Sequence, residues 1–245
     1  MSKFYILVGS LLIIGLFNVS AQTTLYNATS HPNLWTSAHS TSNSSLVGNF
    51  PGTGTPLGDA WGLYANSLQT SAMTFNFGQS LQVDGYIEIA ISLGFNDGGI
   101  VGFSLQDNLG TNRFESYYIG NHGSDTFKLN DAGGQDDITG PNTSFNASSW
   151  KAAVPEFQTI RFTLSPANSY QLSFDGVNVT NTGLTIAASD ISQIRIFNYN
   201  AGSTSDHNQY FDNLVISIPE PSAVSLLGLT GLLALRRARK DQPKT

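Results

Sequence analysis

The sequence predicts an all-β protein folded as an antiparallel β-sandwich, and three observations point to it. Between its two apolar ends, the chain is rich in Thr, Ser, Asn, Gly, Phe, Ile and Val and poor in strong helix formers. Several segments alternate apolar and polar residues with the period of a half-buried strand. Turn-forming residues recur between these segments. We therefore expect about 10 to 14 short strands, arranged as a sandwich or barrel.

The first 21 residues have the layout of a secretory signal peptide. Lys3 precedes an apolar stretch over residues 4–17, and the small residues that end in Ala21 suit a signal peptidase. We expect cleavage after Ala21; the alternative is an uncleaved N-terminal anchor. Residues 22–217 then form one β-sandwich domain. That length supports one hydrophobic core without disulfides, since the sequence has no cysteine.

The clearest strand signals lie in the middle of the chain. Residues 87–93, 160–164 and 170–174 each place apolar side chains on one face and mostly polar ones on the other. Asp175-Gly176 follows the third segment and predicts a two-residue hairpin turn, because both residues tolerate the left-handed backbone that such a turn needs.

Weaker signals complete the expected sandwich. Residues 194–196 and 210–216 predict two further strands near its end. Residues 37–55 are polar and rich in Gly, Pro and Ser, and they predict a long exposed loop.

Charge is distributed unevenly along the chain. Residues 22–217 hold five of the eleven basic residues and fifteen of the seventeen acidic ones, a formal balance of −10. Such a domain repels nucleic acid and anionic lipid headgroups, so we expect neither as a partner. It remains compatible with cation binding or with solubility alone.

The C-terminal residues 218–245 form three distinct pieces. Pro219-Glu220-Pro221 is a rigid, extended spacer, because each proline restricts its own backbone and that of its predecessor. An uncharged apolar run follows over residues 223–235, and a helix of that length reaches roughly 20 Å, against about 30 Å of bilayer hydrocarbon. The run ends in a basic cluster of Arg236, Arg237, Arg239 and Lys240.

This tail predicts membrane insertion that is short or transient. The basic cluster at residues 236–240 favours a cytoplasmic C-terminus, which leaves the folded domain outside the inner membrane. The alternative is an amphipathic helix packed on the domain, but the run has no polar stripe at helical spacing.

In motif order and terminal position, the tail closely resembles the PEP-CTERM sorting signal of Gram-negative bacteria. The resemblance implies recognition by an exosortase, a membrane-embedded cysteine protease that cuts near Pro219-Glu220-Pro221. It also implies a cell-surface or exopolysaccharide-associated location. It carries no information about the fold of residues 22–217.

A second resemblance covers residues 85–217. The strand at residues 158–164, the hairpin at residues 170–176 and the late Tyr210-Phe211-Asp212-Asn213-Leu214 segment look like a concanavalin A-like jelly roll of the laminin-G, lectin and glucanase type. The resemblance implies a carbohydrate-binding or structural module, or alternatively a glycoside hydrolase or lyase.

The sequence gives little support for catalysis. Glucanases of this fold carry Glu-x-Asp-x-x-Glu on one strand, and hydrolysis needs two carboxylates facing one cleft. Here Glu88 is followed by Ala90 and Ile91 where further acids would be needed. We therefore expect no enzyme activity and no catalytic residue.

An acidic, glycine-rich segment over residues 131–137 is the candidate metal site. Asp131, Asp136 and Asp137 supply oxygen atoms of the kind that calcium prefers. The alternative is a solvated hairpin turn in which an aspartate caps its own backbone. We expect no other cofactor.

Sugar binding without catalysis needs an aromatic platform beside amides and carboxylates. The three tryptophans, Trp35, Trp61 and Trp150, are the candidates for that platform, and the alternative for each is a place at the edge of the core. Tyr117 and Tyr118 are adjacent on a predicted strand, so they face opposite ways. Extracellular polysaccharide is therefore the expected ligand, whereas the exosortase as processing partner is implied by the resemblance of the tail.

Overall fold

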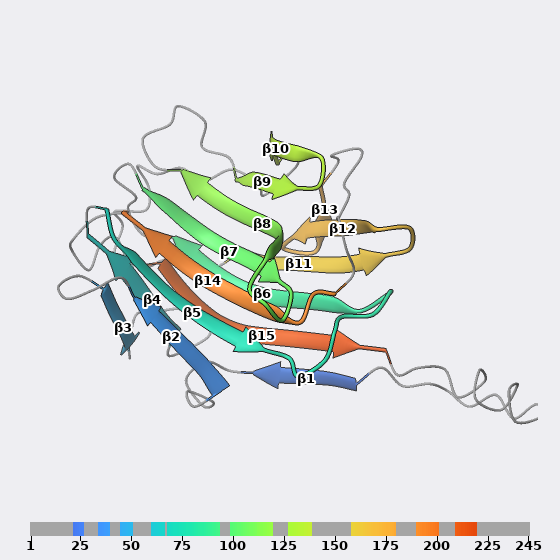
Figure 1. The fold of residues 1–245 in the computed structure, drawn as a ribbon, viewed down its shortest axis with the longest axis horizontal. Coiled ribbons are helices and arrows are strands. Elements are labelled where there is room, and N and C mark those ends of the chain that lie inside the picture. Colours follow the sequence, from blue (N-terminus) through green and yellow to red (C-terminus); the bar gives the residue numbers. More distant parts are fainter. Residues whose placement is uncertain are drawn as a thin grey trace, which may run out of the picture. The chain divides into compact units, whose positions relative to one another are not determined.

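Two antiparallel sheets make up the folded domain, as Figure 1 shows. The structure is a computed structural model that describes residues 22–26, 34–39, 45–50, 60–66, 68–93, 99–119, 127–138, 158–179, 190–200 and 209–219. Sheet A has eight strands in the order β13-β12-β11-β6-β15-β4-β3, with β1 also paired to β15. Sheet B has seven, in the order β10-β9-β8-β7-β14-β5-β2. The predicted all-β antiparallel sandwich is confirmed.

The chain passes between the two sheets several times, and β7 to β10 and β11 to β13 each stay within one sheet. Sheet A consists of β1 (Gln22–Tyr26), β3 (Ser45–Phe50), β4 (Ala60–Ala65), β6 (Tyr86–Leu93), β11 (Gln158–Ser165), β12 (Ser169–Phe174), β13 (Val177–Asn178) and β15 (Gln209–Ile218). Sheet B consists of β2 (Trp35–His39), β5 (Thr70–Asn76), β7 (Ile100–Gln106), β8 (Asn112–Ile119), β9 (Lys128–Asp131), β10 (Gly134–Asp137) and β14 (Gln193–Tyr199).

The exposed loop expected over residues 37–55 is wrong in part. The end of β2 lies within it and pairs with β5, and β3 lies wholly within it and pairs with β4. Both strands end their sheets. A terminal strand is held by backbone hydrogen bonds to one neighbour, so it needs little of the apolar alternation that reveals a central strand. These additions bring the described strands to fifteen, above the expected range.

The core lies between the sheets and comes from alternate residues of their strands. Ile87, Ile89 and Ile91 on β6 are almost fully buried, as the period of two predicted. Sheet B presents Phe103 and Phe114 toward them, and aromatic rings fill much of the space between. Among the largest fully buried side chains are Phe103, Phe114, Phe127, Phe162, Phe174 and Phe211.

The Asp175-Gly176 hairpin is also confirmed. It joins β12 to β13, and its two turn residues have φ values of 50° and 78°. Both values lie in the left-handed region that a type I′ hairpin turn requires.

Two buried amides tie the sheets together near the centre of sheet B. The Asn198 side chain donates from Nδ2 to the carbonyl of Leu63 on β4, over 2.9 Å. Gln209 on β15 donates from Nε2 to the carbonyl of Gly102 on β7, over 3.1 Å. Because buried amides need partners, these bonds help to fix the relative placement of the sheets.

Residues 21–219 form one compact unit. The predicted signal peptide over residues 1–21 lies outside the described residues, as does the tail from Glu220 onward. In the part of the chain that the structure describes, no helix is long and apolar enough to cross a membrane.

Candidate functional site

The outer face of sheet B collects polar side chains over β8, β9 and β10. On β8, Phe114, Ser116 and Tyr118 point into the core, so Glu115 and Tyr117 point outward. Strand pairing sets Asn130 of β9 opposite Glu115, and Gln135 of β10 opposite Asn130. Three adjacent strands therefore present one polar row.

Glu115 is the centre of a hydrogen-bonded network on this face. Its Oε1 accepts a hydrogen bond from Asn112, and its Oε2 accepts one from Asn130 over 3.2 Å. Asn112 in turn accepts one from Gln106 over 2.7 Å. The register of β7 and β8 shifts between Leu105 and Gln106, and this irregularity sets Asn112 opposite Gln106.

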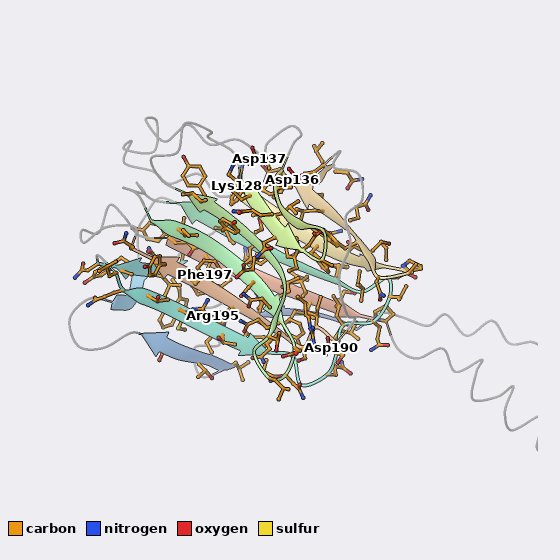
Figure 2. The ribbon with its side chains drawn as sticks, turned by 45° about the horizontal axis from the view of Figure 1, so that its top comes forward. Lys128, Asp136, Asp137, Asp190, Arg195 and Phe197 are labelled. Carbon is orange, nitrogen blue, oxygen red and sulfur yellow. The ribbon has the colours of Figure 1, made fainter. Side chains whose placement is uncertain are left out.

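A second row of side chains, Tyr117, Lys128 and Asp137, lies next to this one on the same face and makes two further contacts. Gln135 donates a hydrogen bond to the hydroxyl of Tyr117, and Lys128 forms an ion pair with Asp137. Burial raises the pKa of the Tyr117 hydroxyl above its ordinary value, so this group stays protonated at neutral pH. Figure 2 shows Lys128, Asp136 and Asp137 at the edge of sheet B that β9 and β10 form.

Strand β14 contributes a cation and aromatic rings to the same outer face. Arg195 lies with its guanidinium carbon 5.2 Å from the centre of the Phe197 ring (Figure 2). Burial lowers the pKa of Arg195 from its ordinary value, while the nearby Glu115 carboxylate opposes that shift. Tyr199, two residues further along, has 37% of its surface exposed and is the open aromatic residue of this strand.

Gly102 explains how the rings pack on this face. It lies opposite both Tyr117 and Phe197, which form a small apolar cluster with Ala72. A Cβ atom at Gly102 would lie 2.3 Å from the Ser116 carbonyl oxygen and 2.6 Å from the Tyr117 Cα atom. Only glycine allows the strands and rings to approach this closely.

We call the resulting surface the polar face of sheet B. It is defined by Asn112, Glu115, Asn130, Gln135, Arg195 and Tyr199. It combines a carboxylate acceptor, amides that donate and accept, a guanidinium donor and one exposed aromatic ring. These groups suit a ligand rich in hydroxyls with one apolar ring face.

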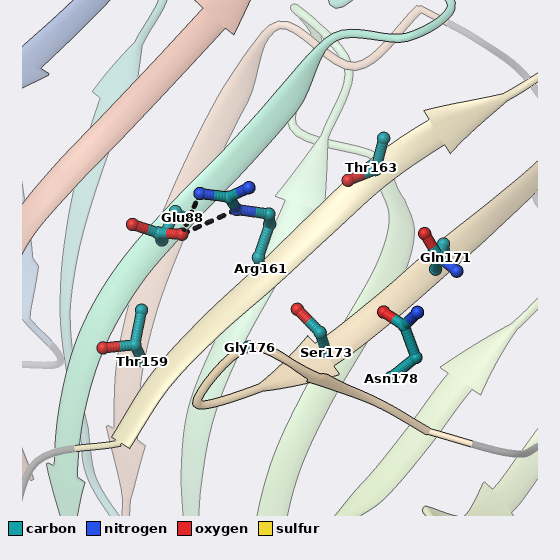
Figure 3. A pocket seen from close by; sticks show the side chains of 8 residues that line it. All are labelled: Glu88, Thr159, Arg161, Thr163, Gln171, Ser173, Gly176 and Asn178. Atoms are coloured by element: carbon teal, nitrogen blue, oxygen red, sulfur yellow. Dashed lines mark hydrogen bonds and ion pairs between the residues drawn. The ribbon is translucent and has the colours of Figure 1, made fainter.

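Glu88 lies on the opposite side of the sandwich, in a polar pocket on the outer face of sheet A (Figure 3). Its Oε2 accepts a hydrogen bond from Nε of Arg161 and forms an ion pair with Nη2 of the same residue, both at 2.6 Å. No second carboxylate lines this pocket among the described residues. The arrangement therefore lacks the carboxylate pair that glycoside hydrolysis needs.

The predicted calcium ligands do not converge. Asp131 accepts hydrogen bonds from the backbone of Gly133 and from the hydroxyl of Tyr170, and Asp136 caps the backbone of its neighbour. Asp137 pairs with Lys128. Over the described ranges, no three acidic or histidine side chains come together as a metal site would require. The segment is instead the β9–β10 hairpin, with Asp131 capping its turn.

The tryptophans do not supply the expected platform in the described part of the chain. Trp35 is 7% exposed and packs between the rings of Phe75 and Phe211, with ring centres 5.4 and 5.1 Å away. Trp61 is half-buried and packs against the core. Trp150 lies outside the described residues. Tyr117 and Tyr118 face opposite ways as expected, but both rings are covered.

Comparisons with known proteins identify the fold and no family. No protein-family model matches the sequence, and no curated protein matches it either. A carbohydrate esterase of the Shiga toxin-encoding bacteriophage phi24B has a similar structure, with a TM-score of 0.54 and 13% identity, over 82% of this chain and 100% of that one.

Two other solved structures show the same likeness. The cellulose-induced protein Cip1 gives a TM-score of 0.53 and 11% identity, over 79% of this chain and 96% of its own. The Crh5 transglycosylase gives 0.52 and 14%, over 83% and 86%. At these identities the likeness shows the fold alone, and it confirms the predicted concanavalin A-like sandwich.

Sequence reasoning missed most of the polar face of sheet B. The alternation of Ile194 and Ile196 with Arg195 and Phe197 was a usable signal, because it marks β14 as a strand with an outward polar and aromatic edge. Glu115 and Asn130 gave no local signal, since only the pairing of β8 with β9 brings them together.

Proposed function

We propose that this chain is an exported, non-catalytic carbohydrate-binding module that acts at the cell surface or in the exopolysaccharide. The observation that carries the proposal is the Glu115 network, in which Asn112 and Asn130 flank the carboxylate on an outward sheet face. Sugar hydroxyls donate and accept at once, so they match such a mixture of amides and a carboxylate.

The exposed aromatic residue of β14 adds a second element of sugar recognition. Tyr199 lies along the same strand and face as Arg195, and its ring offers an apolar surface against which a pyranose ring can pack. Solved structures with this fold include a carbohydrate esterase and a transglycosylase, which supports a carbohydrate ligand by analogy of fold.

Absence of catalysis is part of the proposal and rests on the carboxylates. Within the described residues, Glu88 is held by Arg161, Glu115 by two amides and Asp137 by Lys128. None of these pairs with a second open carboxylate, as the acid and base of a glycosidase would.

Binding is tested by depletion of the full-length protein on insoluble neutral polysaccharides, with release of reducing ends measured in the same samples. Asn130→Ala combined with Tyr199→Ala removes one amide and one ring from the polar face of sheet B. Affinity is expected to fall about 10- to 100-fold, because a hydrogen bond and an aromatic contact each contribute about 1 kcal/mol.

A matched control changes an amide and a large apolar residue elsewhere. Asn108 and Leu109 lie exposed at the turn between β7 and β8, so the double alanine variant at these positions should bind as the parent does. If the variant with Asn130→Ala and Tyr199→Ala binds polysaccharide as tightly as the parent, the polar face of sheet B is not the binding site. Reproducible hydrolysis would overturn the non-catalytic assignment.

We also propose that the C-terminal tail is a sorting signal that an exosortase processes after transient membrane insertion. The extended Pro219-Glu220-Pro221 spacer suits a protease, which binds extended backbone, and the basic cluster at residues 236–240 would hold the end at the cytoplasmic face. Mass spectrometry of the surface protein from the native host should find no peptide from residues 226–240. Recovery of that peptide in the mature protein would identify the segment as a retained anchor.

Two variants make the tail test specific. Glu220→Ala combined with Pro221→Ala should leave uncleaved, membrane-bound protein, because the recognition spacer is lost. Replacement of Arg236, Arg237, Arg239 and Lys240 with Gln should reduce retention and release unprocessed protein. Normal processing of both variants would contradict a sorting role for these residues.

A further inference from the structure

The outer face of sheet A carries a polar hollow, on the side of the sandwich opposite the polar face of sheet B. Its volume is about 250 Å³, and it opens over β6, β11, β12 and the short edge strand β13. Its lining residues are Glu88, Thr159, Arg161, Thr163, Gln171, Ser173, Gly176 and Asn178. We call it the sheet A pocket (Figure 3).

The lining is polar because the sheet alternates. Ile160, Phe162 and Leu164 of β11 point into the core, so Thr159, Arg161 and Thr163 point out. The Asp175-Gly176 turn then brings the short strand β13 back along β12, which sets Asn178 opposite Ser173. Three strands, β11, β12 and β13, thus direct hydroxyl and amide groups toward one hollow.

Among the described residues that line the pocket, the charged side chains are one matched pair that is already fixed in place. Glu88 lies opposite Arg161 across β6 and β11, and the guanidinium carbon lies 4.3 Å above the centre of the Tyr86 ring. Stacking and the ion pair together hold the guanidinium in one orientation. The pair cancels in charge, so the pocket has no preference for an ionic ligand.

The ion pair leaves hydrogen-bonding capacity on both partners. Both contacts from Arg161 end on Glu88 Oε2, which leaves Oε1 and the Nη1 group without a partner among the described residues (Figure 3). One hydroxyl can donate to Oε1 while its neighbour accepts from Nη1, so a vicinal diol fits the two groups together.

The remaining groups extend this capacity. Within the described ranges, the side chains of Thr163, Gln171 and Asn178 make no hydrogen bond, and they surround the pair on the side toward β13. The volume is below the roughly 300–1,000 Å³ of sites for drug-sized ligands. A single sugar ring is therefore the appropriate size of ligand.

We propose that the sheet A pocket is a second, independent binding site for one neutral, hydroxyl-rich sugar residue, such as the end or a branch of a glycan. The ion pair has no net charge, and the groups around it can still donate and accept hydrogen bonds. The ligand is therefore neutral and rich in hydroxyl groups. Glycans that carry carboxylate or sulfate groups bind more weakly, because Arg161 is already neutralised by Glu88 and the domain carries a formal balance of −10.

The test titrates the full-length protein, labelled with nitrogen-15, with the methyl glycosides of glucose, galactose and mannose and with methyl glucuronide. The side-chain amide signals of Gln171 and Asn178 report on the pocket directly. At least one neutral glycoside should shift both signals to saturation, and methyl glucuronide should bind less tightly. The variant Gln171→Ala with Asn178→Ala, followed through backbone signals of β11, should raise the apparent Kd about tenfold.

Two controls separate this proposal from the proposed function. Gln82→Ala with Asn108→Ala removes an exposed glutamine and asparagine outside both surfaces and should leave the Kd unchanged. Asn130→Ala with Tyr199→Ala should also leave it unchanged, so a failure of the sheet B site does not affect this result. The proposal is overturned if no neutral glycoside shifts the two amide signals, if only methyl glucuronide does, or if the pocket variant binds as the parent does.

Discussion

Tyr170 links the two sheets, because it lies on β12 of sheet A and contacts β9 of sheet B. It belongs to β12, and its hydroxyl donates to Oδ2 of Asp131 on β9 over 2.7 Å. The ring stacks on Phe162 with centres 4.9 Å apart and meets Phe114 edge-on at 5.0 Å. Tyr170→Phe therefore removes one cross-sheet hydrogen bond and leaves the ring contacts in place.

The geometry of the Tyr170–Asp131 bond sets the loss of folding stability expected for Tyr170→Phe. A hydrogen bond to a charged acceptor contributes about 1.5–3 kcal/mol to stability. Asp131 is half-buried and keeps its bond from the Gly133 backbone, so water can compensate part of the loss. We expect Tyr170→Phe to lower the free energy of unfolding by about 1–2 kcal/mol, which is about 2–8 °C in Tm for a domain of this size.

Urea and thermal unfolding of the full-length protein measure this change. Tyr199→Phe is the matched control, because its exposed hydroxyl has no hydrogen-bond partner among the described residues and its loss should change stability by less than about 0.5 kcal/mol. A double-mutant cycle with Asp131→Ala isolates the Tyr170–Asp131 coupling. A variant as stable as the parent, or a coupling near zero, would refute the view that this bond joins the sheets.

Three further predictions concern stability. Burial, reinforced by Asp131, raises the pKa of Tyr170 above its ordinary value of 10, so above about pH 10 the unfolded state loses a proton that the folded state keeps. Stability should then fall by up to about 1.4 kcal/mol per pH unit, and Tyr170→Phe should remove that share of the slope in urea melts. Gly102→Ala should destabilise by about 1–3 kcal/mol or more, because the new Cβ meets backbone atoms of β8; an unchanged Tm would contradict the close strand approach. The Thr111 backbone N–H holds the pKa of Asp107 below its usual range, so the stabilisation from Asp107 is present at neutral pH and is lost as the pH falls through that lowered pKa. Asp107→Ala should therefore lower Tm at pH 7 and weaken the fall of Tm with decreasing pH. A fall of Tm in acid identical to the parent's would count against this role of Asp107.

The fold was readable from the sequence where burial is one-sided. Strands β6, β11 and β12 each carry an apolar face and a more polar face, so alternation revealed them, and Asp175-Gly176 revealed the turn between β12 and β13. Strands β2 and β3 were not predicted, because terminal strands are held by backbone pairing and need no regular alternation of apolar and polar side chains.

The candidate sites were less readable because they depend on strand pairing between distant segments. Glu88 and Arg161 are 73 residues apart in the chain and meet only because β6 pairs with β11. Trp35, a candidate for a sugar platform, takes the alternative place and packs in the core between Phe75 and Phe211, whereas Tyr199 is exposed on the outer face.

A crystal structure of the protein with an oligosaccharide from the polysaccharide it binds would show whether the polar face of sheet B holds a glycan. We expect a sugar ring packed on Tyr199, with hydroxyls hydrogen-bonded to Glu115 and Asn130. An oligosaccharide bound only elsewhere on the domain, with these three side chains unoccupied, would contradict it.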